Sequence, residues 1–117
     1  NNYAKISSYG DSNFANITQF GSSNTAYITQ NKGKFYGIDV AGSNTADIFQ
    51  SGVSNKGYIT QNGALNTATI KQLNNGNTAT ITQNGAFNDV SITQYGGKSY
   101  SITQTGNFIP PVTIVQK

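Results

Sequence analysis

Isoleucine recurs along this chain at nearly constant intervals. Eleven of its twelve isoleucines follow one another at steps of 10 to 12 residues. All nine glutamines stand two residues after one of these isoleucines, asparagine stands four residues before most of them, and glycine stands four residues after most of them. The chain is therefore a tandem repeat of eleven units with the pattern Asn-x-Ala-x-Ile-x-Gln-x-Gly-x-x.

The spacing inside the unit predicts a β-strand followed by a tight reversal. Asn, Ala, Ile and Gln alternate with other residues, so in an extended chain all four side chains lie on one face. The intervening positions are rich in Thr and aromatic residues, which favour strands. Glycine then supplies backbone angles that suit a turn.

Two units complete one rung of a coil, which places every strand over the strand two units earlier. We therefore predict one all-β domain over residues 1–117, a β-solenoid of about 5.5 two-strand rungs with eleven short strands in two facing parallel sheets, stacked as in cross-β amyloid. The first predicted sheet contains strands 2–8, 24–30, 44–50, 66–72, 88–94 and 110–116, and the second contains strands 13–19, 34–40, 55–61, 77–83 and 98–104.

Stacking places like residues about 4.8 Å apart in columns along the coil. Isoleucine would fill the dry interior, and buried amides would satisfy one another along a column, each donating to the next carbonyl. The predicted core columns are Ile6, Ile17, Ile28, Ile38, Ile48, Ile59, Ile70, Ile81, Ile92, Ile102 and Ile114; Gln19, Gln30, Gln50, Gln61, Gln72, Gln83, Gln94, Gln104 and Gln116; and Asn13, Asn24, Asn44, Asn55, Asn66, Asn77 and Asn88.

The ends of such a coil are edge strands, which can pair with another chain. We expect contacts between subunits at Asn2, Ala4 and Ile6 at one end and at Val112, Ile114 and Gln116 at the other. An odd number of strands predicts that each subunit is turned by half a revolution from the last. Because Pro110 and Pro111 lack the N–H that a ladder uses, the last strand should start late or lie at an exposed end.

Two units depart from the pattern. Residues 34–40 carry Lys34, Tyr36 and Val40 where Asn, Ala and Gln are expected, and residues 98–104 carry Lys98 and Tyr100. Because both units fall in the same predicted sheet, we expect a wider, partly wet corner there.

The composition of the chain excludes several classes of function. Only 9% of the residues are charged, the net charge is +3 and there is no cysteine, so disulfide and thiolate chemistry are excluded. The lysines form no cluster, which argues against a nucleic-acid partner, and no apolar run approaches the roughly 20 residues of a membrane helix. Four isolated Asp without Glu or His supply no acid–base pair, so we predict neither an enzyme nor a cofactor or metal site.

The unit, as it stands from Asn66 to Asn77 and from Asn77 to Asn88, resembles the curlin repeat of bacterial curli fibres. The resemblance implies a subunit exported unfolded through an outer-membrane secretion pore. It would then self-assemble outside the cell into functional amyloid fibres of a biofilm matrix, for adhesion and cell aggregation. No charged and apolar leader precedes the repeat, so a mature form is expected.

Several functions fit such a repeat. A major fibre subunit is favoured because most Gln and all Ile positions are intact, and a nucleator subunit with similar repeats is the alternative. An ice-binding solenoid would need a flat threonine array, which Thr78, Thr80 and Thr82 match only locally. A monomeric adhesin would persist unassembled at micromolar concentration.

Overall fold

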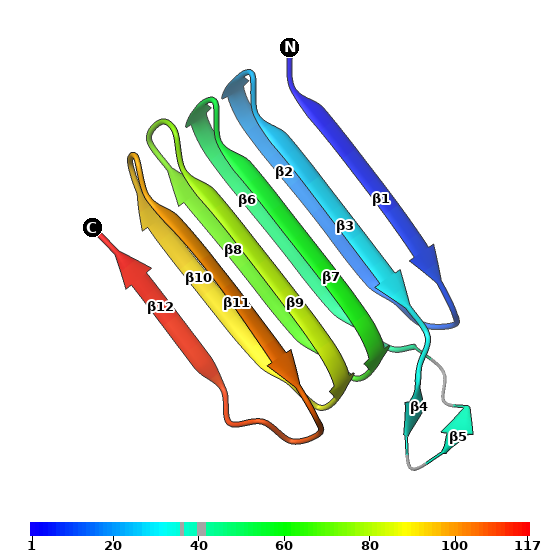
Figure 1. Ribbon diagram of the computed structural model, residues 1–117. Helices are drawn as coiled ribbons and strands as arrows, with labels where there is room; N and C mark the ends of the chain where they lie inside the picture. The colour runs from blue at the N-terminus through cyan, green and yellow to red at the C-terminus, as the bar shows by residue number, and fades with distance from the viewer. Residues whose placement is uncertain (36, 40–41) are drawn as a thin grey trace.

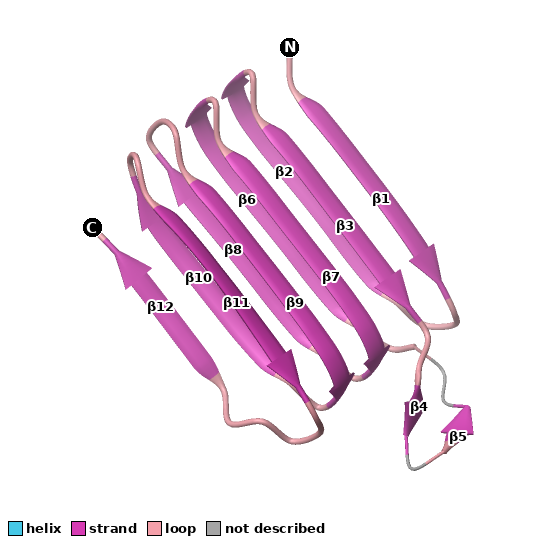
Figure 2. Cartoon of the chain, in the orientation of Figure 1, coloured by secondary structure: helices cyan, strands magenta, loops and turns pink. Residues whose placement is uncertain are grey.

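The computed structural model describes residues 1–35, 37–39 and 42–117. Two five-stranded parallel sheets lie face to face, and the chain passes from one to the other as it coils (Figure 1). The two termini lie at opposite ends of the stack. The described residues form strands, turns and loops but no helix (Figure 2). The predicted class, an all-β solenoid with two facing parallel sheets, is confirmed.

The two sheets are named here after their first strands. The β1 sheet consists of β1 (Tyr3–Tyr9), β3 (Thr25–Asn31), β7 (Lys56–Ala64), β9 (Thr78–Ala86) and β11 (Ser99–Thr105), in that order. The β2 sheet consists of β2 (Phe14–Ser22), β6 (Thr45–Val53), β8 (Thr67–Leu73), β10 (Asp89–Tyr95) and β12 (Val112–Gln116). Two short strands, β4 (Lys34–Phe35) and β5 (Ile38–Asp39), pair with each other in an antiparallel hairpin.

The strands of each sheet stack without a shift in register. Ile28 pairs with Ile59 and Ile59 with Ile81 in the β1 sheet, and the same in-register pairing runs through the β2 sheet. A shift of one residue would turn every inward side chain outward, so the repeat fixes this register strongly.

The hairpin corrects the predicted strand count. The described strand residues of this unit, 34–35 and 38–39, do not add a strand to either sheet but form the hairpin, which projects from one corner of the solenoid (Figure 1). The physical reason is that the Asn and Gln positions that tie other strands into the stack are Lys34 and Val40 in this unit. Tyr36 and Val40 themselves lie outside the described residues. The predicted wide corner shared with residues 98–104 is therefore wrong, since β11 (Ser99–Thr105) lies in the β1 sheet and the hairpin does not.

Because the strand predicted at residues 34–40 is not part of either sheet, the strands before it stack on other partners than predicted. Strands 2–8 and 24–30 were expected in the sheet of 44–50, but β3 stacks on β7. Strand 13–19 was expected beside 34–40, but β2 stacks on β6. Ten strands in two sheets make five complete rungs, in place of five and a half. The half revolution expected between subunits depended on an odd number of stacked strands. The number is even, so this expectation is wrong.

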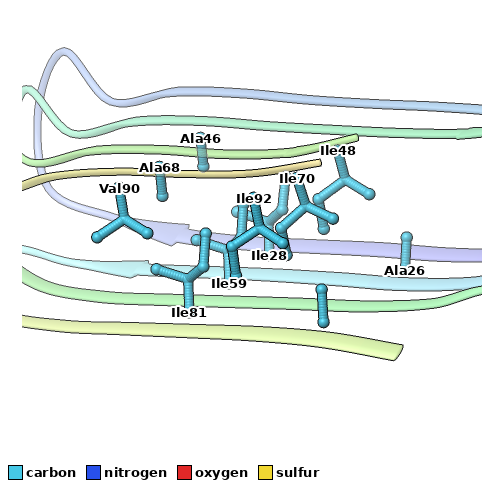
Figure 3. Close-up of a cluster of buried hydrophobic side chains, with 11 residues drawn as sticks. Ala26, Ile28, Ala46, Ile48, Ile59, Ala68, Ile70, Ile81, Val90 and Ile92 are labelled. Atoms are coloured by element: carbon cyan, nitrogen blue, oxygen red, sulfur yellow. The ribbon is translucent and has the colours of Figure 1, made fainter. Parts of the chain in front are cut away.

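The core is a thin layer between the sheets. Ile28, Ile59 and Ile81 point from the β1 sheet toward Ile48, Ile70 and Ile92 of the β2 sheet (Figure 3). The molecule measures 42 × 26 × 13 Å, and its smallest dimension is close to the ~10 Å that separates two packed sheets. Alanines such as Ala26 and Ala46 lie in the same layer, where their small side chains let the facing sheet approach.

The last strand begins late, as predicted. β12 starts at Val112, directly after Pro110 and Pro111, and lies at the edge of its sheet. A proline is tolerated at such a place because no ladder hydrogen bond is lost inside the sheet.

Candidate functional site

Two columns of glutamine amides run through the interior. In each column the Nε2 of one glutamine donates to the Oε1 of the next glutamine toward the C-terminus. In the β1 sheet the pairs are Gln30–Gln61 (3.1 Å), Gln61–Gln83 (2.9 Å) and Gln83–Gln104 (3.2 Å). In the β2 sheet they are Gln19–Gln50 (2.8 Å), Gln50–Gln72 (2.8 Å), Gln72–Gln94 (3.0 Å) and Gln94–Gln116 (2.8 Å).

The second hydrogen of each inner amide crosses to the other sheet. Gln61 Nε2 donates to the carbonyl oxygen of Thr45 at 2.9 Å, and Gln72 Nε2 donates to that of Lys56 at 2.8 Å. Each such glutamine therefore joins neighbouring rungs and also ties the two sheets together. A buried amide is costly unless its donors and acceptor are all engaged, and in Gln61 and Gln72 they are.

The asparagine columns work differently from the expected amide ladder. Their Oδ1 atoms mainly accept backbone N–H groups of the next asparagine, as from Asn55 to Asn24 and from Asn77 to Asn55, both at 3.0 Å. Their Nδ2 atoms mainly donate to backbone carbonyls at or near the ends of strands, as from Asn66 to Gly85 at 2.9 Å. Asparagine thus fixes each turn over the next one. Direct bonds between asparagine side chains occur as well, from Asn77 Nδ2 to Asn55 Oδ1 at 3.0 Å.

A third amide ladder was missed by the sequence reasoning. On the outer face of the β1 sheet, Asn31 Nδ2 donates to Asn62 Oδ1 at 2.7 Å, and Asn62 Nδ2 donates to Asn84 Oδ1 at 2.8 Å. These residues follow the glutamine at a position that varies in the other units. The available signal was the recurrence of Asn directly after Gln30, Gln61 and Gln83.

The structure places most predicted core residues between the sheets. The residues that are at most 4% exposed are Ile28, Ile48, Ile59, Ile70, Ile81, Ile92, Gln30, Gln50, Gln61, Gln72, Gln83, Gln94, Gln104, Asn24, Asn44, Asn55, Asn66, Asn77 and Asn88. Those of intermediate exposure, in the two outermost rungs, are Asn13, Ile17, Gln19, Ile102, Ile114 and Gln116.

Two isoleucines are much more exposed than expected of a core column. Ile6 is in register with Ile28 but is 46% exposed because β1 is an edge strand. The expectation that Ile38 joins the column is wrong. It lies on the hairpin and is 67% exposed, since the hairpin leaves the stack.

The two ends of the solenoid are each formed by two edge strands, β1 and β2 at one end and β11 and β12 at the other. The predicted end residues Ala4 and Ile6 are exposed on β1, and Asn2 Oδ1, just before β1, accepts the N–H of Asn24. The predicted residues Val112, Ile114 and Gln116 are half-buried on β12.

These two sets do not belong to the same sheet, which corrects the expected match between them. The strand at the opposite edge of the sheet that ends in β12 is β2, which carries Ala15, Ile17 and Gln19. The strand at the opposite edge of the sheet that begins with β1 is β11, which carries Tyr100, Ile102 and Gln104. The sequence reasoning missed both of these edges because the hairpin changed the order of the strands.

The chemistry of the described surface is limited. Residues 1–35, 37–39 and 42–117 contain no pocket and no group of acids that could hold a metal ion. They also contain no helix that could cross a membrane. One carboxylate on the surface, that of Asp47, accepts a hydrogen bond from Asn16 Nδ2 at 2.9 Å. What the arrangement offers is unpaired strand edges with aligned side chains, which are suited to pairing with further strands.

Comparison with known proteins supports the repeat. Comparison with curated proteins and with solved structures finds no match. The family model described as the curlin associated repeat matches residues 10–34, 43–73 and 75–106. The gap between its first two matches, residues 35–42, contains the hairpin except for its first residue, Lys34. Because these three segments cover most of the chain, the chain belongs to the curlin repeat family.

Proposed function

We propose that this chain is a structural, non-enzymatic subunit that self-assembles head to tail into extracellular curli-type fibres. The observation that carries the proposal is the match between the two ends of the solenoid. Val112, Ile114 and Gln116 on β12 present the same inward pattern as Ala15, Ile17 and Gln19 on β2. One copy can therefore continue the β2 sheet of another with like residues in register.

The direction of the glutamine ladder favours head-to-tail stacking. Gln19 heads its column, so its Oε1 has no preceding glutamine to accept from, while its Nε2 donates to Gln50. Gln116 ends the column, so its Nε2 has no following glutamine to donate to. Placing Gln116 of one copy next to Gln19 of another joins a donor to an acceptor. Placing two N-terminal ends together would bring two acceptors face to face.

Five complete rungs define the geometry of the fibre. Because both ends present one edge of each sheet, a second copy can stack without rotation, with β1 following β11 and β2 following β12. Each copy then adds about 24 Å of length, at about 4.8 Å per rung. This arrangement replaces the half revolution expected from eleven strands.

Membership of the curlin repeat family supports a proposal for the biological setting. We place the chain outside the cell after secretion, in a biofilm matrix where fibres support adhesion and cell aggregation. Its partners are other copies of itself, an outer-membrane secretion pore and a nucleator subunit. The major-subunit role is favoured because nine of the ten stacked strands carry glutamine in the ladder position.

Assembly of the purified chain tests the proposal. Incubated monomer should form dye-binding fibrils whose diffraction shows a spacing of about 4.7 Å along the axis. Ile6→Lys should block growth, because Ile6 is exposed in the monomer but would be buried in a junction. Ser7→Lys, whose side chain lies on the outer face of the same strand, is the matched control and should assemble. Monomers that persist for days, or unimpaired growth of Ile6→Lys, would contradict the proposal.

A further inference from the structure

One buried acceptor in the core lacks a donor. Gln30 is fully buried, yet in the part of the chain that the structure describes its Oε1 is the one buried side-chain nitrogen or oxygen without a hydrogen-bond partner. Its Nε2 is fully engaged, with Gln61, Phe14 and Asn44 as acceptors. Since an unsatisfied buried acceptor is costly, this atom marks an interruption in the ladder.

The cause is a single residue of the repeat. Ser8 pairs with Gln30 in the register of the β1 sheet, so it occupies the place of the preceding glutamine. The serine hydroxyl stands on a short side chain that does not extend as far into the core as a glutamine amide. In the other sheet the equivalent first residue is Gln19, and its ladder starts with a bond to Gln50 at 2.8 Å.

The last glutamine of the same column keeps one donor for a following copy. Gln104 Nε2 donates to the carbonyl oxygen of Pro110, in the loop that leads to β12, at 3.4 Å. The inner glutamines likewise use one hydrogen for a carbonyl of their own chain, as Gln83 does with Thr67 at 2.9 Å, and the other for the next glutamine. Both columns can therefore donate to a following copy, but in the β1 sheet the residue that comes next is Ser8, not a glutamine.

We propose that the two sheets contribute unequally to the junction between two copies, and that Ser8 sets the strength of this junction. This inference rests on the proposed function. In the β2 sheet, Gln116 of one copy donates to Gln19 of the next, and the ladder runs on unbroken. In the β1 sheet, Gln104 of one copy meets Ser8 of the next, so the ladder breaks once per subunit and Gln30 Oε1 stays without an amide donor. The partner recognised at this surface is a second copy of this chain, selected mainly through the β2 sheet.

Three variants test the inference, with filament dissociation in denaturant as the readout. Ser8→Gln should slow dissociation about tenfold, because the introduced amide donates to Gln30 and accepts from the neighbouring copy. Gln19→Ser, which opens the matched gap in the other sheet, should speed dissociation by about the same factor. Ser7→Gln adds the same side chain to the outer face of β1 and should leave the rate unchanged.

The monomer offers a second readout. Ser8→Gln should raise the denaturant midpoint of the unassembled chain relative to Ser7→Gln, since Gln30 Oε1 gains its donor within one molecule. Filaments of Ser8→Gln that dissociate at the rate of the unchanged chain would overturn the inference while leaving the proposed function intact. Failure of every variant and of the unchanged chain to assemble would contradict the proposed function, and the inference with it.

Discussion

The side-chain nitrogen of Gln61 lies 2.9 Å from the side-chain oxygen of Gln83, the residue in the same position one rung further along the coil. The same nitrogen donates to the carbonyl of Thr45 in the facing sheet, and Gln61 Oε1 accepts from Gln30. One buried side chain therefore connects three rungs of its own sheet and both sheets of the solenoid. The stability of the fold should depend strongly on this residue.

Replacing Gln61 by leucine keeps the size of the side chain but removes its polar atoms. Gln83 Oε1 loses its donor, and Gln30 Nε2 and the Thr45 carbonyl each lose one bond. Gln30 Nε2 keeps the carbonyl oxygens of Phe14 and Asn44 as acceptors, so the buried group left unsatisfied is Gln83 Oε1. At about 1–3 kcal/mol for such a group, the free energy of unfolding should fall by about 1–3 kcal/mol. Urea denaturation of the monomer measures this. Thr60→Ala, on the outer face of the same strand, is the control and should change it by less than about 0.5 kcal/mol; equal effects would argue against the ladder as a source of stability.

Gly63, near the end of β7, lies very close to Gly85, the residue with which it pairs in β9. A Cβ atom built on Gly63 would overlap the carbonyl oxygen of Gly85, and its φ of 137° disfavours other residues. Gly63→Ala should therefore push these strand ends apart and prevent native stacking, seen as loss of the β-sheet circular dichroism signal or a much lower melting temperature.

Gly97→Ala controls for backbone strain in the preceding experiment. Gly97 also has a positive φ, of 62°, but an added Cβ would meet no atom within 4 Å. This variant should fold, with a loss of about 1–2 kcal/mol. If both variants fold equally well, close contact between these strand ends is not what requires glycine at Gly63.

The hairpin should be dispensable for the fold. The residues that flank it already stack on neighbouring turns, with Lys32 N–H donating to Tyr9 at 2.9 Å and Ser43 N–H donating to Asp11 at 3.0 Å. Deleting residues 33–41 and making Lys32→Gly leaves four residues between Gln30 and Asn44, the number that separates Gln61 from Asn66.

The shortened chain should keep its circular dichroism spectrum. Its free energy of unfolding should match that of the full chain to within about 1 kcal/mol, because loop length affects closure entropy only weakly. It should also still form fibrils. An unfolded deletion variant would show that the hairpin contributes to the core and does not merely interrupt the repeat.

Leu65 is held in a conformation that leucine avoids. Its φ is 58° and its side chain is 47% exposed, so little packing offsets the backbone strain. Leu65→Gly should stabilise the monomer by about 1 kcal/mol, measured by thermal or urea unfolding. Leu73→Gly, in the extended strand β8, should have the opposite effect. A loss of stability in the first variant would refute the strain argument.

Three tyrosine side chains on the outer face of the β1 sheet interact with one another electrostatically. Tyr27 lies 5.3 Å from Tyr3 and 5.6 Å from Tyr58 between ring centroids. Partial desolvation, followed by the charge and hydrogen bond of Tyr3 and the charge of Tyr58, raises the pKa of Tyr27 above its ordinary value.

Because the folded state holds the Tyr27 proton more tightly than the unfolded state does, its contribution favours folding below the ordinary tyrosine pKa of about 10 and is lost as the pH rises through the raised value. Tyr3→Phe removes the second and third causes of the shift, the charge and the hydrogen bond of Tyr3, and should lower the pKa of Tyr27, followed by absorbance of the phenolate. An unchanged titration curve would argue against coupling between the two rings.

The fold was readable from the sequence because the same residues serve in every rung. The recurrence of Ile and Gln gives both the strand period and the parallel register, and the ten stacked strands pair in that register. The prediction was wrong at Ile38. This residue lies ten positions after Ile28 and ten before Ile48, so its spacing looks like that of a regular unit. Those two steps together span one ordinary unit plus nine inserted residues. The loss of Asn at Lys34 and of Gln at Val40 was the better signal.

The ends of the molecule were harder to predict than its middle. Ala4, Ile6, Val112 and Ile114 were correctly recognised as repeat positions near the termini, but which strands share a sheet depends on the total count of strands. When one unit is wrongly counted as a stacked strand, the predicted sheet of every strand on one side of it is therefore wrong. The sequence also did not predict that asparagine side chains would bond mainly to backbone groups of neighbouring rungs. The residue pattern does not show in which direction those backbone groups point.

A whole number of rungs has a consequence for the two outer surfaces of a fibre. Stacked without rotation, every β1 sheet would join into one continuous side, on which the charges are Lys5 and Lys56 among hydroxyl, amide and tyrosine side chains. Every β2 sheet would form the opposite side, which carries Asp47, Lys71 and Asp89 together with exposed phenylalanines. The fibre would be a ribbon with two chemically distinct sides, and a mineral, a dye or a neighbouring cell would meet a different surface on each.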